Sequence, residues 1–393
     1  MKKRVLVVCI ILVCATFLWF LCLHDMTIKN RTGSVVVQSV VVQKAPLCFT
    51  SESFSPFYLP EDAPNGIYVE DVFFSPDTKR IYVTALSSSV ERVKSKSEGQ
   101  SLTLAPFAEP DYLSLPFGFH IYYANFPPSS KSDYHLLTEI PGIVPTAKPS
   151  FCKDDSSAFI FVANFVQIVP TREKPEGVAN GCIETQNDIQ INRKKVVRVS
   201  TTDGTFEEIA DVPQTGSVSD AVTICWADRH LVYVCCGGSV FKLSFTAGPP
   251  SAELHYPRKS STSESATGRG IVGYQDVSHR LVLQESYRDD KGERKVELVI
   301  LRDSGDVEKR VLIPLARLSA LHLFDRARKF LACDLARGMY FGDLSDDRFI
   351  SVAFIPTRYI GKIFDMTSDG MAIVWPTDAP AFTQPFWIWK FQE

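Results

Sequence analysis

From residue 35 onward the chain consists of short apolar runs separated by polar turns, and one arrangement of the two occurs six times. An aromatic residue leads into a tight turn that contains aspartate, and an apolar strand follows, as in Phe74-Ser75-Pro76-Asp77 before Ile81. The strands after the six turns begin at Ile81, Phe159, Leu231, Leu281, Phe330 and Met371. The shorter intervals match four short strands with their turns, which is one blade of a β-propeller, and the longer ones must contain inserted loops.

Apolar strands that stop at a proline are a second, independent marker of the same repeat. They end at Pro141, Pro213, Pro257, Pro314 and Pro356, each ahead of the next acidic turn. Proline donates no backbone hydrogen bond, so it ends a strand or lies at a sheet edge. Long helical periodicity is absent from this region. The pattern predicts an all-β fold, a six-bladed β-propeller, in which we expect each strand after an acidic turn to be the innermost strand of its blade.

The two ends of the repeat region suggest how the ring closes. A valine-rich segment, residues 35–43, precedes the first acidic turn, and an aromatic strand, residues 386–391, follows the last one. Neither end holds a whole blade. We expect the two segments to pair side by side, so that an N-terminal strand completes the last blade and removes both free edges.

Residues 5–23 are apolar apart from Thr16, and this run precedes the repeats. In a helix 19 residues reach about 28 Å, close to the hydrocarbon thickness of a bilayer. Lys2, Lys3 and Arg4 come before it and should remain in the cytosol. The sequence therefore predicts one transmembrane helix that acts as an uncleaved signal anchor. A cleaved signal peptide is the alternative, but its apolar region is usually shorter and followed by small residues.

This orientation divides the chain into a cytosolic tip at residues 1–4, the anchor at 5–23, a stalk at 24–34 and the propeller at 35–393. The expected protein is a single-pass type II membrane protein of the secretory pathway or cell surface, with the propeller lumenal or extracellular. Asn30-Arg31-Thr32 in the stalk is the only glycosylation sequon, which makes Asn30 the candidate glycosylation site of a glycoprotein.

The net charge excludes one class of partner. A net charge of −3 provides no basic face of the kind that nucleic acid requires, so we expect no nucleic-acid partner.

Seven cysteines lie outside the anchor. Because seven is an odd number, disulfide pairing would leave at least one cysteine unpaired. The alternative is that most of them are small buried residues. The adjacent Cys235 and Cys236 should point to opposite faces of a strand.

Two sets of polar residues follow the repeat. The first is the turn aspartates, Asp77, Asp155, Asp228, Asp276, Asp325 and Asp369. One carboxylate per blade is too few for calcium, so we expect each to bond the backbone of its own turn. The second set is Asn164, Glu285 and Asp334, which lie four or five residues into the strands expected to line the channel. They are candidate ligands of a cation, with solvated polar residues at the channel end as the alternative.

Motifs of catalysis are absent from the sequence, so no catalytic residue and no organic cofactor is predicted. Residues 268–273 fit the dinucleotide pattern G-x-G-x-x-G, but a Ser/Thr-rich segment precedes them and no helix follows. We therefore expect a flexible loop there rather than a nucleotide site. Residues 84–118 and 165–193 are expected to be loops inserted into the first and second blades.

The repeats resemble the extracytoplasmic propellers of the TolB-like and YVTN-type domains, through Phe74-Ser75-Pro76-Asp77 and the later aromatic, aspartate and strand copies. An anchor followed by six blades is also similar to the strictosidine synthase-like and paraoxonase-like hydrolases, and Pro64-Asn65-Gly66-Ile67 is similar to their Asn-Gly turns. The resemblance covers residues 35–393 in architecture. The second family implies a calcium ion in the channel and a hydrolase activity.

These observations support one leading function and one alternative. The leading hypothesis is a membrane-anchored, non-enzymatic binding or scaffold module that presents a propeller face and its inserted loops to a protein or glycan partner. The alternative is a calcium-dependent hydrolase of the paraoxonase-like or strictosidine synthase-like kind. Calcium binding distinguishes the two, because the hydrolase requires the ion and the scaffold does not.

Overall fold

The computed structural model describes residues 35–37, 40–44, 55–57, 68–88, 117–152, 155–170, 187–213, 222–245, 250–257, 266–275, 277–313, 318–324, 328–334, 338–344, 350–355, 360–376 and 386–390. The predictions for the cytosolic tip, the membrane anchor, the stalk and Asn30 lie outside these residues. Within them, no helix has the length and apolar character needed to cross a membrane.

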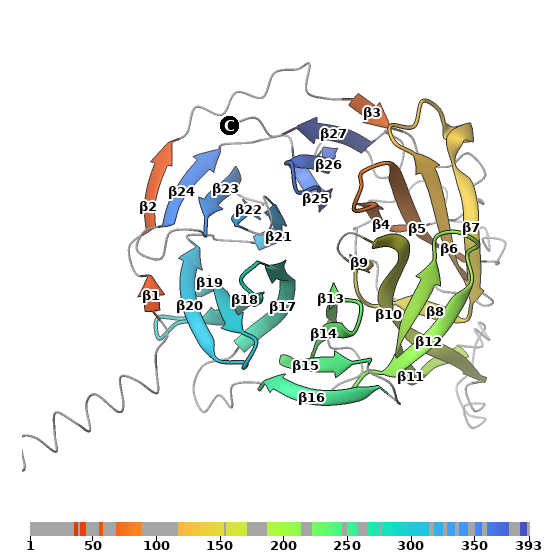
Figure 1. Ribbon diagram of the computed structural model, residues 1–393, viewed down its shortest axis with the longest axis horizontal. Helices are drawn as coiled ribbons and strands as arrows, with labels where there is room; N and C mark the ends of the chain where they lie inside the picture. Colours follow the sequence, from red (N-terminus) through yellow and green to blue (C-terminus); the bar gives the residue numbers. More distant parts are fainter. Residues whose placement is uncertain are drawn as a thin grey trace, which may run out of the picture.

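Six sheets, antiparallel apart from two added N-terminal strands, stand around a central axis and form a six-bladed β-propeller (Figure 1). Blade 1 is β4 (Tyr68–Phe74), β5 (Arg80–Ser88), β6 (Phe117–Asn125) and β7 (His135–Pro141). Blade 2 is β8 (Ile143–Pro145), β9 (Ser150–Cys152), β10 (Asp155–Pro170), β11 (Asn187–Ser200) and β12 (Phe206–Asp211). Blade 3 is β13 (Thr223–Asp228), β14 (Leu231–Cys236), β15 (Ser239–Ser244) and β16 (Ser251–Tyr256).

The remaining three blades follow in ring order. Blade 4 is β17 (Ala266–Gln275), β18 (Arg280–Arg288), β19 (Arg294–Arg302) and β20 (Val307–Ile313). Blade 5 is β21 (Leu318–Phe324), β22 (Lys329–Asp334), β23 (Gly338–Asp343) and β24 (Ile350–Ile355). Blade 6 is β25 (Ile360–Met366), β26 (Met371–Pro376) and β27 (Phe386–Lys390) together with an N-terminal strand, β3 (Ser55–Phe57). The prediction of an all-β, six-bladed propeller closed by an N-terminal strand is confirmed.

The identity of the closing strand was predicted wrongly. The segment 35–43 does not lie beside β27; β3 does, with Ser55 opposite Ile388. Within the valine-rich segment, β1 (Val35–Val37) pairs in parallel with β20, and β2 (Val40–Lys44) pairs in parallel with β24. The segment thus adds a fifth strand to blade 4 and another to blade 5. We call β1, β2 and β3 the N-terminal belt, because they follow the outside of blades 4, 5 and 6 in ring order (Figure 1).

The strands after the acidic turns are not innermost, which is a second correction. The innermost strands are β4, β13, β17, β21 and β25, with β8 and β9 in blade 2, and the acidic turn joins each to the second strand outward (Figure 1). The strands starting at Ile81, Phe159, Leu231, Leu281, Phe330 and Met371 are these second strands. They are the most continuously apolar because strands flank both of their edges and neighbouring blades cover both of their faces.

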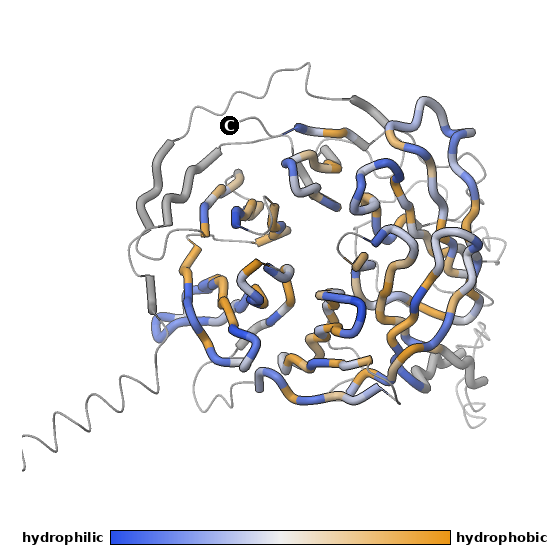
Figure 2. Tube along the Cα trace, viewed as in Figure 1, coloured by the Kyte–Doolittle hydropathy of each residue, from blue (hydrophilic) through white to orange (hydrophobic). Residues whose placement is uncertain are grey.

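Side-chain alternation along these strands builds six separate cores, one between each pair of neighbouring blades. Phe73 packs with blade 2 while Phe74 packs with blade 6. Likewise Cys235 faces blade 4 and Cys236 faces blade 2, as the sequence predicted. Figure 2 shows the apolar residues concentrated along the strands and the hydrophilic ones at the turns. Each blade is thus buried on both faces, and stability depends on contacts between blades.

Candidate functional site

Side chains of one blade bind backbone groups of the next where the innermost strands meet. An innermost strand has a partner strand on only one side, so its channel-side N–H groups need other acceptors. Ser150 Oγ accepts the Trp226 N–H of blade 3 at 3.0 Å, and Thr223 Oγ1 accepts the Ile271 N–H of blade 4 at 2.6 Å. These short polar side chains therefore fix the angle between neighbouring blades.

Asp365 makes the corresponding contact where the last blade meets the first. Its Oδ2 accepts the Phe74 N–H of blade 1 at 2.8 Å, and its Oδ1 lies 2.5 Å from Lys148 Nζ. Lys148 comes from the break between β8 and β9 in blade 2, and it also donates to the Phe364 carbonyl at 2.6 Å. One carboxylate thus ties blades 6, 1 and 2 together beside the channel.

Asp365→Ala is expected to lower the free energy of unfolding by about 2–3 kcal/mol, because it leaves the Phe74 N–H and the Lys148 ammonium without their shared acceptor. Urea denaturation followed by tryptophan fluorescence would measure it. Asp290→Ala is the matched control, since Asp290 is exposed in the turn between β18 and β19, and we expect a change within about 0.5 kcal/mol. Equal effects of the two substitutions would remove the assigned role of Asp365.

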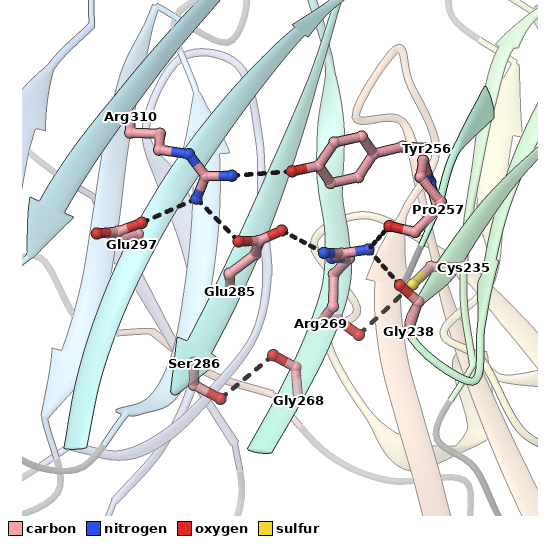
Figure 3. Close-up of polar contacts among 10 residues, drawn as sticks. All are labelled: Cys235, Gly238, Tyr256, Pro257, Gly268, Arg269, Glu285, Ser286, Glu297 and Arg310. Carbon is pink, nitrogen blue, oxygen red and sulfur yellow. Dashed lines mark hydrogen bonds and ion pairs between the residues drawn. The ribbon is translucent and has the colours of Figure 1, made fainter. Parts of the chain in front are cut away.

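A buried network of four charged side chains lies in and beside the seam between blades 3 and 4 (Figure 3). Glu285 on β18, one of the three predicted ligands, is at its centre. Arg269 Nη2 lies 2.6 Å from Glu285 Oε1, and Arg310 Nη1 lies 2.9 Å from Glu285 Oε2. Arg310 Nη1 also lies 3.0 Å from Glu297 Oε2. Two guanidinium groups and two carboxylates balance each other in charge.

Neighbouring polar groups complete this network. Arg310 Nη2 donates to the Tyr256 hydroxyl at 2.8 Å, and Tyr287 donates its hydroxyl to Glu297 Oε1 at 2.6 Å. Arg269 lies over the Tyr256 ring, 4.4 Å from its centroid, and donates to the carbonyls of Gly238 and Pro257. Arg269 therefore joins an innermost strand of blade 4 to two segments of blade 3, which is a positioning role.

Three groups in the seam, Arg310, Tyr256 and Cys235, have pKa values shifted away from neutral pH. Burial on its own disfavours the charged form of Arg310, but Glu285 and Glu297 outweigh burial and the pKa of Arg310 is raised. Burial raises the pKa of Tyr256, and it raises the pKa of the Cys235 thiol to about 12. Arg310 therefore stays charged, while Tyr256 and Cys235 stay protonated. Such groups hold a structure together and are poorly suited to exchanging protons with a substrate.

The structure does not bring the three predicted ligands onto one channel wall. Asn164, Glu285 and Asp334 are buried on the second strands β10, β18 and β22 of blades 2, 4 and 5. Asn164 lies opposite Lys194 across β10 and β11, and Glu285 is held by two guanidinium groups. Among the described residues, no three His, Cys, Asp or Glu side chains form a group that could hold a metal. Calcium binding stays the expectation of the alternative hydrolase hypothesis alone, to be tested by titration with and without Asp334→Ala.

Three of the four described turn aspartates, Asp77, Asp155 and Asp228, bond a backbone N–H of their own turn as the sequence predicted, and Asp369 accepts the Thr367 hydroxyl instead. Asp77 accepts the Ser75 hydroxyl at 2.6 Å and the Lys79 N–H at 3.2 Å, and its pKa is lowered, chiefly by the Ser75 hydrogen bond. Asp155, Asp228 and Asp369 also bond within their own turns. Asp276 and Asp325 lie outside the described residues. These carboxylates shape turns.

Arg269, Arg310 and Glu297 were missed by the sequence analysis. Arg269 belongs to the G-x-G-x-x-G segment, which was expected to be a loop but lies inside β17. Arg310 and Glu297 lie in strands that contain several other charged residues, so the sequence does not distinguish these two as buried. Among the described cysteines, Cys152, Cys225, Cys235, Cys236 and Cys333 form no disulfide, which agrees with the alternative of small buried residues.

Comparison with known proteins identifies the fold. No protein-family model matches the sequence, and no curated protein matches it. A solved structure of a protein of unknown function from Dyadobacter fermentans is 11% identical with a TM-score of 0.50, over 86% of this chain and 98% of that one. The β-propeller domain of Cps50 (Swd1) from Myceliophteria thermophila is 12% identical with a TM-score of 0.45, over 84% and 86%. The oligogalacturonate lyase of Vibrio parahaemolyticus is 9% identical with a TM-score of 0.43, over 89% and 99%. At such low identity the likeness shows the fold alone.

Proposed function

We propose that this propeller is a binding or scaffold module that engages a protein partner through its outer rim. In the full proposal, residues 5–23 anchor the chain in a membrane and residues 35–393 lie on the extracytoplasmic side. The apolar run with its basic flank supports the anchoring part. A glycan is the other partner class that the sequence allowed, but apolar side chains on the rim favour protein.

The uneven covering of the rim carries this proposal. The N-terminal belt adds a fifth strand to β20 and to β24, whereas β7, β12 and β16 are the outermost described strands of blades 1, 2 and 3. Large apolar side chains that lie in strands and are exposed occur on these three: Leu136 at 52%, Phe206 at 44% and Leu254 at 53%. Each of these side chains would lose apolar surface to water-free contact with a partner that follows the rim of blades 1–3.

A rim variant tests the proposal. In cells that express the full-length chain, Leu136→Lys, Phe206→Lys and Leu254→Lys together should abolish most of the partner cross-linked to blades 1–3, with positions mapped by mass spectrometry. Thermal unfolding should shift by only a few degrees, because all three side chains are exposed.

The matched control is Val277→Lys, since Val277 is 80% exposed in the turn between β17 and β18, away from the outer strands. We expect this variant to keep the cross-links. Cross-links that survive in the triple variant, or that map to the turn face and disappear with Val277→Lys, would contradict a rim-binding function.

A further inference from the structure

The outer edge of β16 differs from the other two uncovered edges in having little to protect it. Natural edge strands are commonly guarded by charged side chains. On β12, Glu207, Glu208 and Asp211 supply three such charges, each in an ion pair with β11. On β16, Glu253 is the single charged residue between Ser251 and Leu254.

Packing of the next blade also leaves β16 the longest accessible stretch. A Cβ atom at Gly305, in the turn between β19 and β20, would lie 2.2 Å from the His255 carbonyl oxygen, so this turn covers β16 from His255 onward. The equivalent turn of blade 2 covers β7 from Leu137, where a Cβ at Gly204 would lie 2.1 Å from the carbonyl oxygen. The exposed part of β16 is therefore residues 251–254, against two residues on β7.

The N-terminal belt shows what fits such an edge. β1 has three residues and β2 has five, and both are extended segments rich in valine that pair in parallel with an outer strand. Residues 251–254 offer a length between the two, four residues. The pairing of β1 with β20 and of β2 with β24 gives two examples of strand addition at the outer edge of a blade. Strand addition is also a common mode of peptide recognition.

Resting on the rim-binding function proposed above, we infer that β16 accepts an extended segment of a protein partner as a fifth strand, with alternating apolar and basic residues. The apolar residues lie beside Ala252 and Leu254 on one face. The basic residues lie beside Glu253 on the other face, where Lys242 of β15 already occupies the inner side. Cross-strand pairs of opposite charge and of apolar residues stabilise added strands.

Two labelled synthetic peptides test this inference with the full-length chain in mild detergent. One alternates valine and lysine, and the other alternates valine and glutamate. The valine–lysine peptide should slow hydrogen exchange of the amides at 251–254 and bind at least about tenfold more tightly than the other peptide. Leu254→Lys should remove this binding, whereas Phe206→Lys on β12 should preserve it.

Glu253→Lys provides the sharpest variant, because it should reverse the preference between the two peptides while leaving the fold intact. Equal binding of both peptides, or no slowing at 251–254, would overturn the inference. Slow exchange at 251–254 without any peptide would also overturn the inference, because the edge would then already be covered. Light scattering would show whether a second copy of the chain covers it, as a dimer, or residues 24–34 of the same chain, as a monomer. If the peptides failed to bind β16 but the triple rim variant still lost its cross-links, the strand-addition inference would be wrong and the rim-binding function would remain supported.

Discussion

Gly305→Ala is expected to lower the free energy of unfolding by at least about 3 kcal/mol, from left-handed backbone strain and forced overpacking together. Gly305 has φ +83°, and its added Cβ would lie 2.2 Å from the His255 carbonyl oxygen of blade 3. The contact is with backbone, so a rotamer change cannot relieve it. Gly204→Ala should behave alike, because its Cβ would meet the Leu137 carbonyl oxygen of blade 1.

Gly292→Ala separates the two causes. Gly292 has φ +77°, but a Cβ added there would have no atom within 4 Å, so only the backbone strain of about 1–2 kcal/mol applies. Urea denaturation of the three variants would measure the difference. A loss at Gly305 no larger than at Gly292 would mean that the turn does not pack on blade 3.

Glu285→Ala is expected to cost about 3–5 kcal/mol, because it leaves two buried guanidinium groups without their shared carboxylate. The side chains of Arg269, Arg310 and Glu285 are only 7%, 13% and 8% exposed, so water cannot replace the lost partner. Glu285→Gln keeps the volume and should still lose most of this stability, which distinguishes the charge from a cavity.

The control for Glu285 is Glu293→Ala. Glu293 pairs with Lys295 at 2.6 Å, but its side chain is 63% exposed, and exposed pairs contribute about 0–1 kcal/mol. Thermal and urea unfolding of the variants would be compared. If Glu285→Gln proved as mild as Glu293→Ala, the network would not hold blade 4 against blade 3.

Local patterns predicted the repeat unit, and the reason is visible in the first turn. Ser75, Asp77 and Lys79 bond to one another within five residues, so the turn is encoded where it stands. Side chains alternate between the two faces of a strand, so the opposite directions of Cys235 and Cys236 also follow from neighbouring positions alone. Blade number followed from counting such turns.

Pairings between distant segments could not be predicted in the same way. A valine-rich strand of three residues fits the outer edge of any blade, so sequence alone did not distinguish β20 and β24 from β27 as its neighbour. Glu285 was selected from the sequence as a candidate ligand on a channel-lining strand, but it is buried on the second strand of blade 4. Its partners, Arg269 and Arg310, come from different strands, and without them a carboxylate in an apolar strand suggests a cation site.

The proposed function requires that the N-terminal belt covers the rim of blades 4 and 5 and that no described strand covers the rim of blades 1–3. Native-state hydrogen exchange of the isolated full-length chain tests it most directly, because outward amides of an uncovered edge strand exchange through small local openings. The account predicts slow exchange along β20 and β24 and fast exchange of alternate amides along β12, the 135–136 part of β7 and the 251–254 part of β16. Equal protection on all five strands, or fast exchange on β20 and β24, would contradict it.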